Sequence, residues 1–395
     1  MAIRSVQQLP LAGRRTFVRV DFNVPLRDGL IQDDTRIRAA LPTLRAVLAA
    51  GGSLVLASHL GRPKAGPDPA YSLGPVAQRL GELLGTPVTL APDVAGPAVE
   101  ALASKLAPGQ VLALENVRFL PGETKNDPGL SRQLASLADL YVNDAFGSCH
   151  RAHASTAGMA AHFGPGRKAA GLLLLAEVEA FRRVLDAPER PFVAVLGGAK
   201  VSDKIGVVRN LLNKVDRLVV GGGMAYTFLA AQGIPTGDSL VEADKVDLAR
   251  ALLGEARALG KELLLPRDHV LGRELAEGTE TRTTAGPEVP EGWKALDIGP
   301  STREAFARAL ADARTVVWNG PMGVFELPAF AEGTFAVARA LASCPGFTVV
   351  GGGDSVSAVQ RSGVADRIGH ISTGGGASLE LLEGQTLPGV AALEE

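Results

Sequence analysis

The chain has 395 residues, 46% of them hydrophobic and 21% charged, with a formal net charge of -2. Because one hydrophobic core stops growing at roughly 250–300 residues, two domains are expected. The charge balance argues against a globally basic nucleic-acid-binding protein. Two cysteines without metal or redox spacing argue against a disulfide-rich secreted protein. The N-terminus lacks an apolar signal region and no apolar run reaches about 18 residues, so we expect a cytoplasmic protein with no membrane partner and no nucleic-acid partner.

Short apolar segments of the first half alternate with helical patterns. The expected strands are 16–20, 53–57, 111–114 and 140–142, and the expected helices are 37–50 and 76–84. In the first of these helices, Leu41, Leu44 and Leu48 share one face. This alternation predicts an α/β fold, in which a parallel sheet is covered by helices on both faces.

Basic residues gather immediately after these strands. An open parallel sheet binds its ligands beyond the carboxyl ends of its strands. A single surface arginine is usually solvated, but several brought together repel one another unless an anion lies among them, and the planar guanidinium suits phosphate or carboxylate. The first half is therefore expected to bind a small, multiply anionic metabolite through Arg36, Arg38, His59, Arg62, Lys64, Arg118, His150, Arg151 and His153.

The segment Cys149-His150-x-x-His153 has a second interpretation, as a metal or nucleophile site. No fourth ligand stands at a useful spacing, and no acid is evidently placed to orient either histidine. We favour a packed cysteine and two histidines that add to the anion site.

The middle of the chain carries the expected domain boundary. Residues 165–171 are rich in Pro, Gly and basic residues, 172–185 have a helical pattern, and 186–191 contain two prolines. We expect an N-terminal domain over 1–170 and a C-terminal domain over 171–382 that begins with the connecting helix. A helix that joins two domains is a candidate hinge.

The segment 192–212 has the pattern of a phosphate site. A buried strand over 192–196 leads into Gly197-Gly198 and Lys200, and Ser202 is the expected N-cap of a helix. Backbone N–H groups, the helix dipole and an ammonium would then face the ligand. The spacing is not that of a P-loop, and the chain has no Gly-x-Gly-x-x-Gly. An ordinary turn with solvated Lys200 and Lys204 therefore stays open as the alternative.

Glycine-rich turns follow the remaining strands of the second half. Strands expected over 217–220, 315–318, 347–350 and 371–373 lead into Gly221–Gly223, Asn319–Gly323, Gly351–Gly353 and Gly374–Gly376. The last two turns each open an apparent helix, which offers N–H groups to phosphates. Asp354 is either a Mg²⁺ ligand or a helix cap, and Glu326 either reaches ribose hydroxyls or is solvated. An anionic acceptor in one half and a nucleotide in the other predict a kinase of small molecules.

On these residues the chain resembles the phosphoglycerate kinase family over essentially its whole length. The blocks that carry the resemblance are VRVDFNVPL from Val18, SHLGRP from Ser58, ENVRF from Glu115, LGGAKVSDKI from Leu196, GGGMAYTFL from Gly221, NGPMGVFE from Asn319, GGGDSV from Gly351 and HISTGGGASLELLEG from His370. They occur in the family's order and at similar spacing. The resemblance implies two doubly wound, Rossmann-like parallel-sheet domains joined by a hinge helix, with 383–395 packing back on the first domain.

The resemblance also implies the site residues, motif by motif. For the acceptor, 3-phosphoglycerate, they are Asp21, Phe22, Asn23, Arg36, His59, Leu60, Gly61, Arg62, Arg118 and Arg151. For the nucleotide they are Gly198, Lys200, Lys204, Gly221, Gly222, Gly223, Gly299, Asn319, Glu326, Gly352, Gly353, Asp354 and Ser355. Asp354 is the implied Mg²⁺ ligand. The implied catalytic residues, which would stabilise the phosphoryl group in flight, are Arg36, Lys200, Gly374, Gly375 and Gly376.

The implied reaction is the reversible transfer of the γ-phosphoryl group of ATP to the carboxylate of 3-phosphoglycerate, in glycolysis and gluconeogenesis. The implied enzyme is a monomer that uses Mg²⁺ with ATP or ADP. The attacking carboxylate is already anionic at pH 7, so no general base is required. A nucleotide-sensing scaffold without catalysis would be expected to lack a charged residue at the transfer point, but Arg36, Lys200 and Asp354 are all present. A dinucleotide dehydrogenase would need the Gly-x-Gly-x-x-Gly fingerprint, which the chain does not have. We weigh both alternatives below the kinase.

Two segments depart from the family's usual pattern. Ser148-Cys149 replaces a small pair, and we expect it to put an oxidisable thiol beside the anion site. The connecting helix starts with the apolar run Leu172–Leu175 in place of a more polar start, which concerns the stiffness of the hinge rather than the chemistry.

Overall fold

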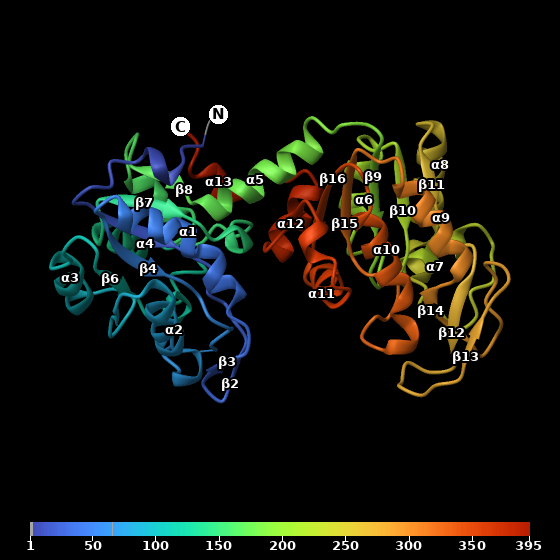
Figure 1. Ribbon diagram of the computed structural model, residues 1–395, viewed down its shortest axis with the longest axis horizontal. Coiled ribbons are helices and arrows are strands. Elements are labelled where there is room, and N and C mark those ends of the chain that lie inside the picture. The colour runs from blue at the N-terminus through green and yellow to red at the C-terminus, as the bar shows by residue number, and fades with distance from the viewer. Residues whose placement is uncertain (1–2, 65) are drawn as a thin grey trace. The chain divides into compact units, whose positions relative to one another are not determined.

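The computed structural model describes residues 3–64 and 66–395 and divides the chain into two compact units. The first unit runs to Glu179 and also takes in Thr386–Glu395, and the second is Ala180–Gln385. Helix α5 (Leu172–Leu185) carries the chain from the first unit into the second (Figure 1). No helix in the described part of the chain combines the length and apolarity needed to cross a bilayer.

A six-stranded parallel sheet forms the centre of the first unit. Its order is β5 (Val88–Leu90), β6 (Val111–Ala113), β4 (Ser53–Ala57), β1 (Arg15–Arg19), β7 (Leu140–Asn143) and β8 (Lys168–Ala170). Because the strands are parallel, the loops that follow β1, β4, β6 and β7 leave the same edge. A short hairpin joins β2 (Leu26–Arg27) and β3 (Leu30–Ile31).

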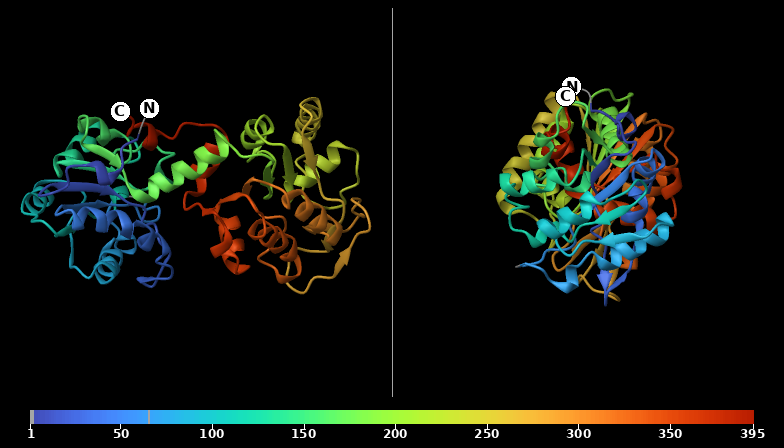
Figure 2. Two further views of the ribbon diagram at one scale, coloured as in Figure 1. Left: turned by 45° about the horizontal axis from the view of Figure 1, so that its top comes forward. Right: turned by 90° about the vertical axis from the view of Figure 1, so that its left-hand side faces the viewer.

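The helices of the first unit are α1 (Thr35–Ala49), α2 (Gly74–Leu84), α3 (Pro97–Ser104), α4 (Pro128–Ser136) and α13 (Pro388–Ala391), with 3₁₀ turns η1 (Val6–Gln8), η2 (Pro69–Tyr71), η3 (Val117–Phe119), η4 (Phe146–Ser148) and η5 (Gly158–His162). Leu41 and Leu44 of α1 lie in the core with Val18 of β1, and Leu48 packs against it, which confirms the predicted apolar face. The two chain ends lie side by side in both figures, where a bridge pairs Ile3 with Glu394 (Figure 2).

The second unit contains a parallel sheet whose strand order is that of a Rossmann fold. The order is β11 (Glu262–Leu264), β10 (Arg217–Val220), β9 (Phe192–Leu196), β15 (Thr315–Asn319), β16 (Phe347–Gly351) and β17 (His370–Ile371). Numbered along the chain this is 3-2-1-4-5-6, so the direction of winding reverses between β9 and β15. The predicted α/β class with two parallel sheets is confirmed.

Seven helices surround the sheets of the second unit in the described chain: α6 (Ile205–Leu212), α7 (Met224–Ala231), α8 (Val246–Ala258), α9 (Pro300–Leu310), α10 (Glu332–Ala342), α11 (Gly353–Arg361) and α12 (Gly375–Leu382). The 3₁₀ turns are η6 (Ala243–Lys245), η7 (Pro328–Phe330) and η8 (Ala365–Arg367). A small antiparallel sheet, β13 (Thr281–Thr283), β12 (His269–Gly272) and β14 (Lys294–Ile298), was not predicted. It packs through Leu271 and Ala295 against Tyr226 and Leu229 of α7.

The predicted start of α6 is wrong. The helix begins at Ile205, with Lys204 at the N-cap position, and Ser202 caps nothing. Both hydrogen-bond donors of Ser202 bind Glu242 instead: the Glu242 carboxylate accepts from the Ser202 hydroxyl at 2.5 Å and from its backbone N–H at 3.0 Å. A side chain from a distant segment therefore replaces the helix as the partner of this serine.

Candidate active site

In the first unit, the loop after β1 presents Asp21 and Asn23. Asp21 accepts a hydrogen bond from the Arg36 guanidinium at 2.8 Å and one from the backbone N–H of Asn23 at 3.2 Å. Burial alone would raise the pKa of the Asp21 carboxyl, but the positive charges around it, Arg36 and Arg19 among them, lower it. Asp21 is therefore ionised, and it holds Arg36 at the N-terminal turn of α1.

Hydrogen bonds fix the loop after β4 to its neighbours. The N–H of Gly61 donates to Asn23 Oδ1 at 2.8 Å, and Arg118 of η3 donates to the Gly61 carbonyl at 2.6 Å. A Cβ at Gly61 would lie 2.3 Å from the ring of Tyr71, so only glycine fits. Three successive strand ends are thereby joined into one surface.

Apart from Arg36, the arginines of this surface, Arg62, Arg118 and Arg151, form no ion pair with the described residues. Arg62 and Arg151 are exposed and make no ion pair among the described residues. Burial, followed by the nearby charges of Arg19 and Arg62, lowers the pKa of Arg118. Such a group of cations repels itself, and a bound anion with several negative oxygens would relieve the repulsion. The structure thus brings together His59, Arg62 and Arg118 with Asp21 and Asn23.

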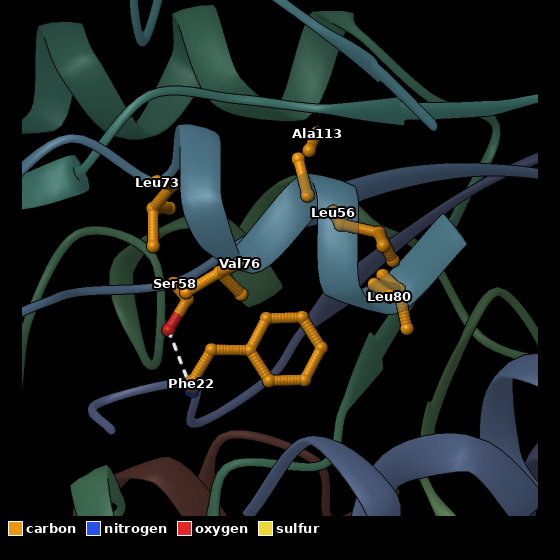
Figure 3. A pocket seen from close by; sticks show the side chains of 8 residues that line it. Phe22, Leu56, Ser58, Leu73, Val76, Leu80 and Ala113 are labelled. Atoms are coloured by element: carbon orange, nitrogen blue, oxygen red, sulfur yellow. Dashed lines mark hydrogen bonds between the residues drawn. The ribbon is translucent and has the colours of Figure 1, made fainter. Parts of the chain in front are cut away.

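Two residues of the implied acceptor set have side chains in the core instead. The ring of Phe22 turns toward Leu56, Val76 and Leu80 around a cavity of about 10 Å³, as Figure 3 shows. Its backbone N–H donates to Ser58 Oγ at 2.8 Å. Leu60 is also buried, and both of its backbone groups bond to Asn116. Phe22 and Leu60 therefore anchor the two loops to the core, and their side chains do not face the anion site.

The sequence reasoning missed Arg19. It expected a strand over 16–20 and gave Arg19 within it no role, whereas the structure buries this residue to 1% exposure, with its Nε donating to Ser155 Oγ at 2.7 Å. Ser155 in turn donates to the buried carboxylate of Glu123 at 2.6 Å. The only sequence signal was a lone charge inside a predicted buried strand, which calls for buried partners.

In the second unit, the turns after β9, β10 and β15 interlock at the point where the sheet reverses. Gly198 N–H donates to the Pro321 carbonyl at 3.0 Å, and Gly222 N–H donates to the Met322 carbonyl at 3.1 Å. Gly222 has a φ of +66°, and a Cβ there would lie 2.7 Å from the Gly198 nitrogen and the Pro321 oxygen. Gly198 and Gly222 therefore allow the backbones of these three turns to lie in direct contact.

Lys204 is buried at the same switch point and is not solvated. It is 9% exposed, and its Nζ donates to the carbonyl of Asn319 at 2.8 Å and to its Oδ1 at 2.5 Å. Burial lowers the pKa of Lys204 to about 8, against the opposing charges of Asp354 and Asp203. The alternative of an ordinary turn expected both Lys200 and Lys204 to be solvated. Lys200 is indeed exposed, but Lys204 is buried, so the alternative is wrong for Lys204.

A cavity of about 540 Å³ opens beside these turns, within the roughly 300–1,000 Å³ typical of small-ligand sites. Five residues of the implied nucleotide set line it: Gly198, Gly222, Gly223, Glu326 and Asp354. The apolar remainder was not predicted, namely Ala199, Tyr226, Leu240, Leu275, Ala295, Leu296, Pro321 and Val324. Leu240 and Leu275 are 50% and 61% exposed, which is unusual for leucine and gives the cavity an apolar rim.

The remaining implied residues surround this cavity indirectly. Asn319 also donates to the Gly351 carbonyl at 3.0 Å, and Ser355 Oγ accepts the N–H of Gly320 at 2.6 Å. Gly352 and Gly353 open α11, and Gly374 precedes α12 at its N-cap position, as predicted. Gly221 packs against Met322, and Gly299 precedes α9; neither is among the residues that line the cavity.

The expectation of an oxidisable thiol beside the anion site is wrong. Cys149 is fully buried, and burial raises the pKa of its thiol to about 12. Its Sγ donates to the Ala145 carbonyl at 3.4 Å, and its own carbonyl accepts the N–H of Gly389 from the returning C-terminal segment. A protonated, enclosed thiol is unreactive.

Comparison with known proteins shows which family the chain belongs to. The family model described as phosphoglycerate kinase matches residues 6–385. Curated proteins named phosphoglycerate kinase from Moorella thermoacetica and Roseiflexus castenholzii are 60% and 55% identical to the chain, each aligned over the full length of both chains. The chain belongs to the phosphoglycerate kinase family.

A solved structure of phosphoglycerate kinase from Coxiella burnetii is similar with a TM-score of 0.91 at 41% identity, and it covers 99% of both chains. The enzyme of that name from Pyrococcus horikoshii gives 0.82 at 32% identity, with 99% of this chain and 98% of the other covered. The predicted phosphoglycerate kinase membership is therefore confirmed, while the role of each site residue stays a prediction.

Proposed function

We propose that the chain catalyses the reversible transfer of the γ-phosphoryl group of ATP to the carboxylate of 3-phosphoglycerate, giving ADP and 1,3-bisphosphoglycerate, a step of glycolysis and gluconeogenesis. Beyond family membership, one observation carries the proposal. One unit carries a cluster of arginines, of which Arg62, Arg118 and Arg151 form no ion pair with the described residues. The other carries a glycine-walled cavity with a buried lysine beside it and the unpaired carboxylate of Asp354 in its lining.

The acceptor is bound by the strand ends of the first unit. His59, Arg62, Arg118 and Arg151 bind its phosphate, and Asp21 and Asn23 orient the glycerate end. Because Arg62 and Arg151 form no ion pair with the described residues, no such pair has to break when they bind a ligand. Arg36 is held by Asp21 at 2.8 Å and acts on the transferring phosphoryl group.

The nucleotide is bound by the cavity of the second unit. Its apolar rim and glycine walls suit the flat face of a base, and the exposed Glu326 suits ribose hydroxyls. Asp354 lies exposed in the first turn of α11, lines the cavity and has no hydrogen-bond partner among the described residues, which fits a single protein ligand for Mg²⁺. Mg²⁺ would there neutralise phosphate charge.

Transfer requires positioning and charge rather than a proton acceptor. The attacking carboxylate is already anionic, and Arg36, Lys200 and the N–H groups at Gly374–Gly376 stabilise the charge on the moving phosphoryl group. Because the acceptor residues and the nucleotide residues belong to different units, the bound substrates have to be brought into line, with α5 as the connecting hinge. We further infer a cytoplasmic monomer that acts on small molecules and not on nucleic acid.

A coupled assay tests this function directly. With ATP, Mg²⁺ and 3-phosphoglycerate, formation of 1,3-bisphosphoglycerate should consume NADH through an added dehydrogenase, and NADH alone should not be consumed. Arg36→Ala should lower turnover by about 10³–10⁵ if Arg36 acts as an arginine finger does, with nucleotide affinity little changed. Near wild-type turnover in that variant would remove Arg36 from the mechanism.

A further inference from the structure

Arg19 is a buried cation at the end of β1, two residues before Asp21. Its Nε donates to Ser155 Oγ at 2.7 Å, and a second guanidinium nitrogen donates to the Val20 carbonyl. Glu123 anchors Ser155 by accepting its hydroxyl at 2.6 Å and its backbone N–H at 2.9 Å. The guanidinium is therefore fixed in one orientation by the Val20 carbonyl at the start of the loop after β1 and by Ser155, which Glu123 anchors.

The third contact of Arg19 is with His59. Its Nη2 lies 3.4 Å from His59 Nδ1, and the Asp21 carboxylate lies 3.9 Å from the same nitrogen. A guanidinium has donors and no acceptor, so a hydrogen bond with Arg19 forces Nδ1 to accept. Asp21 would favour a proton on Nδ1, but it is beyond hydrogen-bond reach and already accepts from Arg36 and Asn23.

We propose that Arg19 is a positioning residue that holds His59 in its neutral form with the proton on Nε2, so that His59 offers the anionic acceptor an uncharged N–H donor. Nε2 makes no hydrogen bond with the described residues and is free to donate. The identity of the acceptor rests on the proposed function, whereas the tautomer rests on the contacts of His59 alone.

The charges around His59 agree with this assignment. Burial favours the neutral ring, and Arg19, Arg118 and Arg36, from β1, η3 and α1, add repulsion for a second proton; Asp21 alone opposes them. Together they lower the pKa of His59 to about 3. A neutral donor adds a hydrogen bond to the phosphate site without adding a like charge to an already crowded set of arginines.

The tautomer can be measured on the unaltered protein. In a long-range ¹H–¹⁵N correlation spectrum of histidine-labelled protein, the His59 signals are identified by their loss in His59→Gln. We expect Nε2 protonated and Nδ1 unprotonated throughout the neutral pH range, with no titration. A proton on Nδ1, or an averaged signal from a charged ring, overturns the proposal whether or not the protein shows kinase activity.

Variants then test whether Arg19 is the cause. In Arg19→Met, His59 Nδ1 loses the guanidinium that faces it, so we expect the ring proton to move toward Nδ1 and Asp21, and the pKa of His59 to rise while burial, Arg118 and Arg36 still hold it below its ordinary value. The KM for 3-phosphoglycerate should then rise about tenfold. Arg19→Lys keeps the positive charge and should bring the His59 spectrum and the KM for 3-phosphoglycerate most of the way back to the wild-type result. The control Arg45→Met removes an exposed arginine of α1 that bonds only the Leu83 carbonyl and should change neither. An unchanged His59 spectrum in Arg19→Met refutes the role of Arg19, and the wild-type spectrum decides the tautomer if that variant does not fold.

Discussion

If Lys204 binds the nucleotide phosphates, as proposed, its burial should make nucleotide binding sensitive to pH. Lys204 has a pKa of about 8 because it is buried, so its ammonium is lost as the pH rises through that value. We expect the KM for ATP to rise by roughly tenfold above that pH, the effect of losing about 1.4 kcal/mol of charge interaction. Steady-state kinetics from neutral to alkaline pH would measure it. Lys204→Arg keeps its charge, and an identical pH dependence in that variant would contradict the assignment.

Asp354 offers a second test at the scale of one side chain. Its carboxylate is exposed and makes no hydrogen bond or ion pair with the described residues, so Asp354→Asn should lower the free energy of unfolding by no more than about 1 kcal/mol, through the lost charge in the first turn of α11 and near Lys204. If it holds Mg²⁺, the Mg²⁺ concentration for half-maximal rate should rise about tenfold or more. Rates measured against Mg²⁺ concentration give the result, with the exposed Asp366→Asn as the matched control. Equal Mg²⁺ dependence in both variants would exclude Asp354 as a ligand.

At the scale of one element, Gly299 distinguishes helix capping from nucleotide binding. Asp268 caps α9 by accepting the N–H groups of Ser301 at 2.9 Å and Thr302 at 2.8 Å. A Cβ at Gly299 would lie 2.3 Å from the carboxyl carbon of Asp268. We therefore expect Gly299→Ala to disrupt the cap and lower the free energy of unfolding by about 1–2 kcal/mol.

Denaturant unfolding and the KM for ATP, measured together, separate the two roles of Gly299. Gly254 in α8 has open space around its missing Cβ, so Gly254→Ala is the matched control and should stabilise the protein by up to about 1 kcal/mol. A raised KM for ATP with unchanged stability in Gly299→Ala would instead place Gly299 in the nucleotide site, as the resemblance implies.

The sequence predicted elements well wherever one strong local pattern decides. The strand 53–57 and the strand 217–220 agree with β4 and β10 residue for residue. The sequence-based predictions were wrong where a contact with a distant segment decides the outcome. Ser202 was expected to cap α6 but hydrogen-bonds to Glu242, and Cys149 was expected to be reactive but is buried. Short strands such as β13, whose residues are all exposed, carry no alternating apolar pattern to detect.

The site shows the same division. Charges and glycines in the turns identified the polar half of each surface, because their residue types are informative one at a time. The apolar lining from Leu240, Leu275 and Leu296 could not be found, because a leucine beside a ligand has the same sequence signal as a leucine in a core. The role of Arg19 depends on Ser155 and Glu123, which are far from it along the chain.

At the scale of the whole molecule, α5 is the element in which the chain passes from one unit to the other. Its first turn is held from within the first unit: Asp144 Oδ1 accepts the N–H of Leu174 at 3.1 Å, and Thr43 Oγ1 accepts that of Leu172 at 2.8 Å. Gly171 leaves room for this carboxylate, since a Cβ there would lie 2.1 Å from Oδ1. The second oxygen, Oδ2, is buried without a partner in the described chain.

This carboxyl should make the stability of the connection depend on pH. Burial raises the pKa of Asp144 from 3.8 to about 7, against weaker opposing bonds from Thr43 and Leu174. Between these values the folded chain keeps the proton and the unfolded chain has lost it, so the stabilising effect is present at low pH and disappears as the pH rises through about 7. Asp144→Asn cannot ionise, so the stability of the variant relative to wild type should increase across this range, by at most about 1.4 kcal/mol per pH unit.

Denaturant unfolding of wild type and Asp144→Asn at a mildly acidic and a mildly alkaline pH measures this difference. Asp28→Asn, at an exposed position where asparagine tolerates the positive φ of 52°, should show none of it. A difference between Asp144→Asn and wild type that stays constant with pH would mean that water reaches Oδ2 in solution and the carboxyl titrates normally. The hydrogen bonds to Asp144 and Thr43 would then still hold the start of α5, but this carboxyl would add no pH dependence to the connection between the two units.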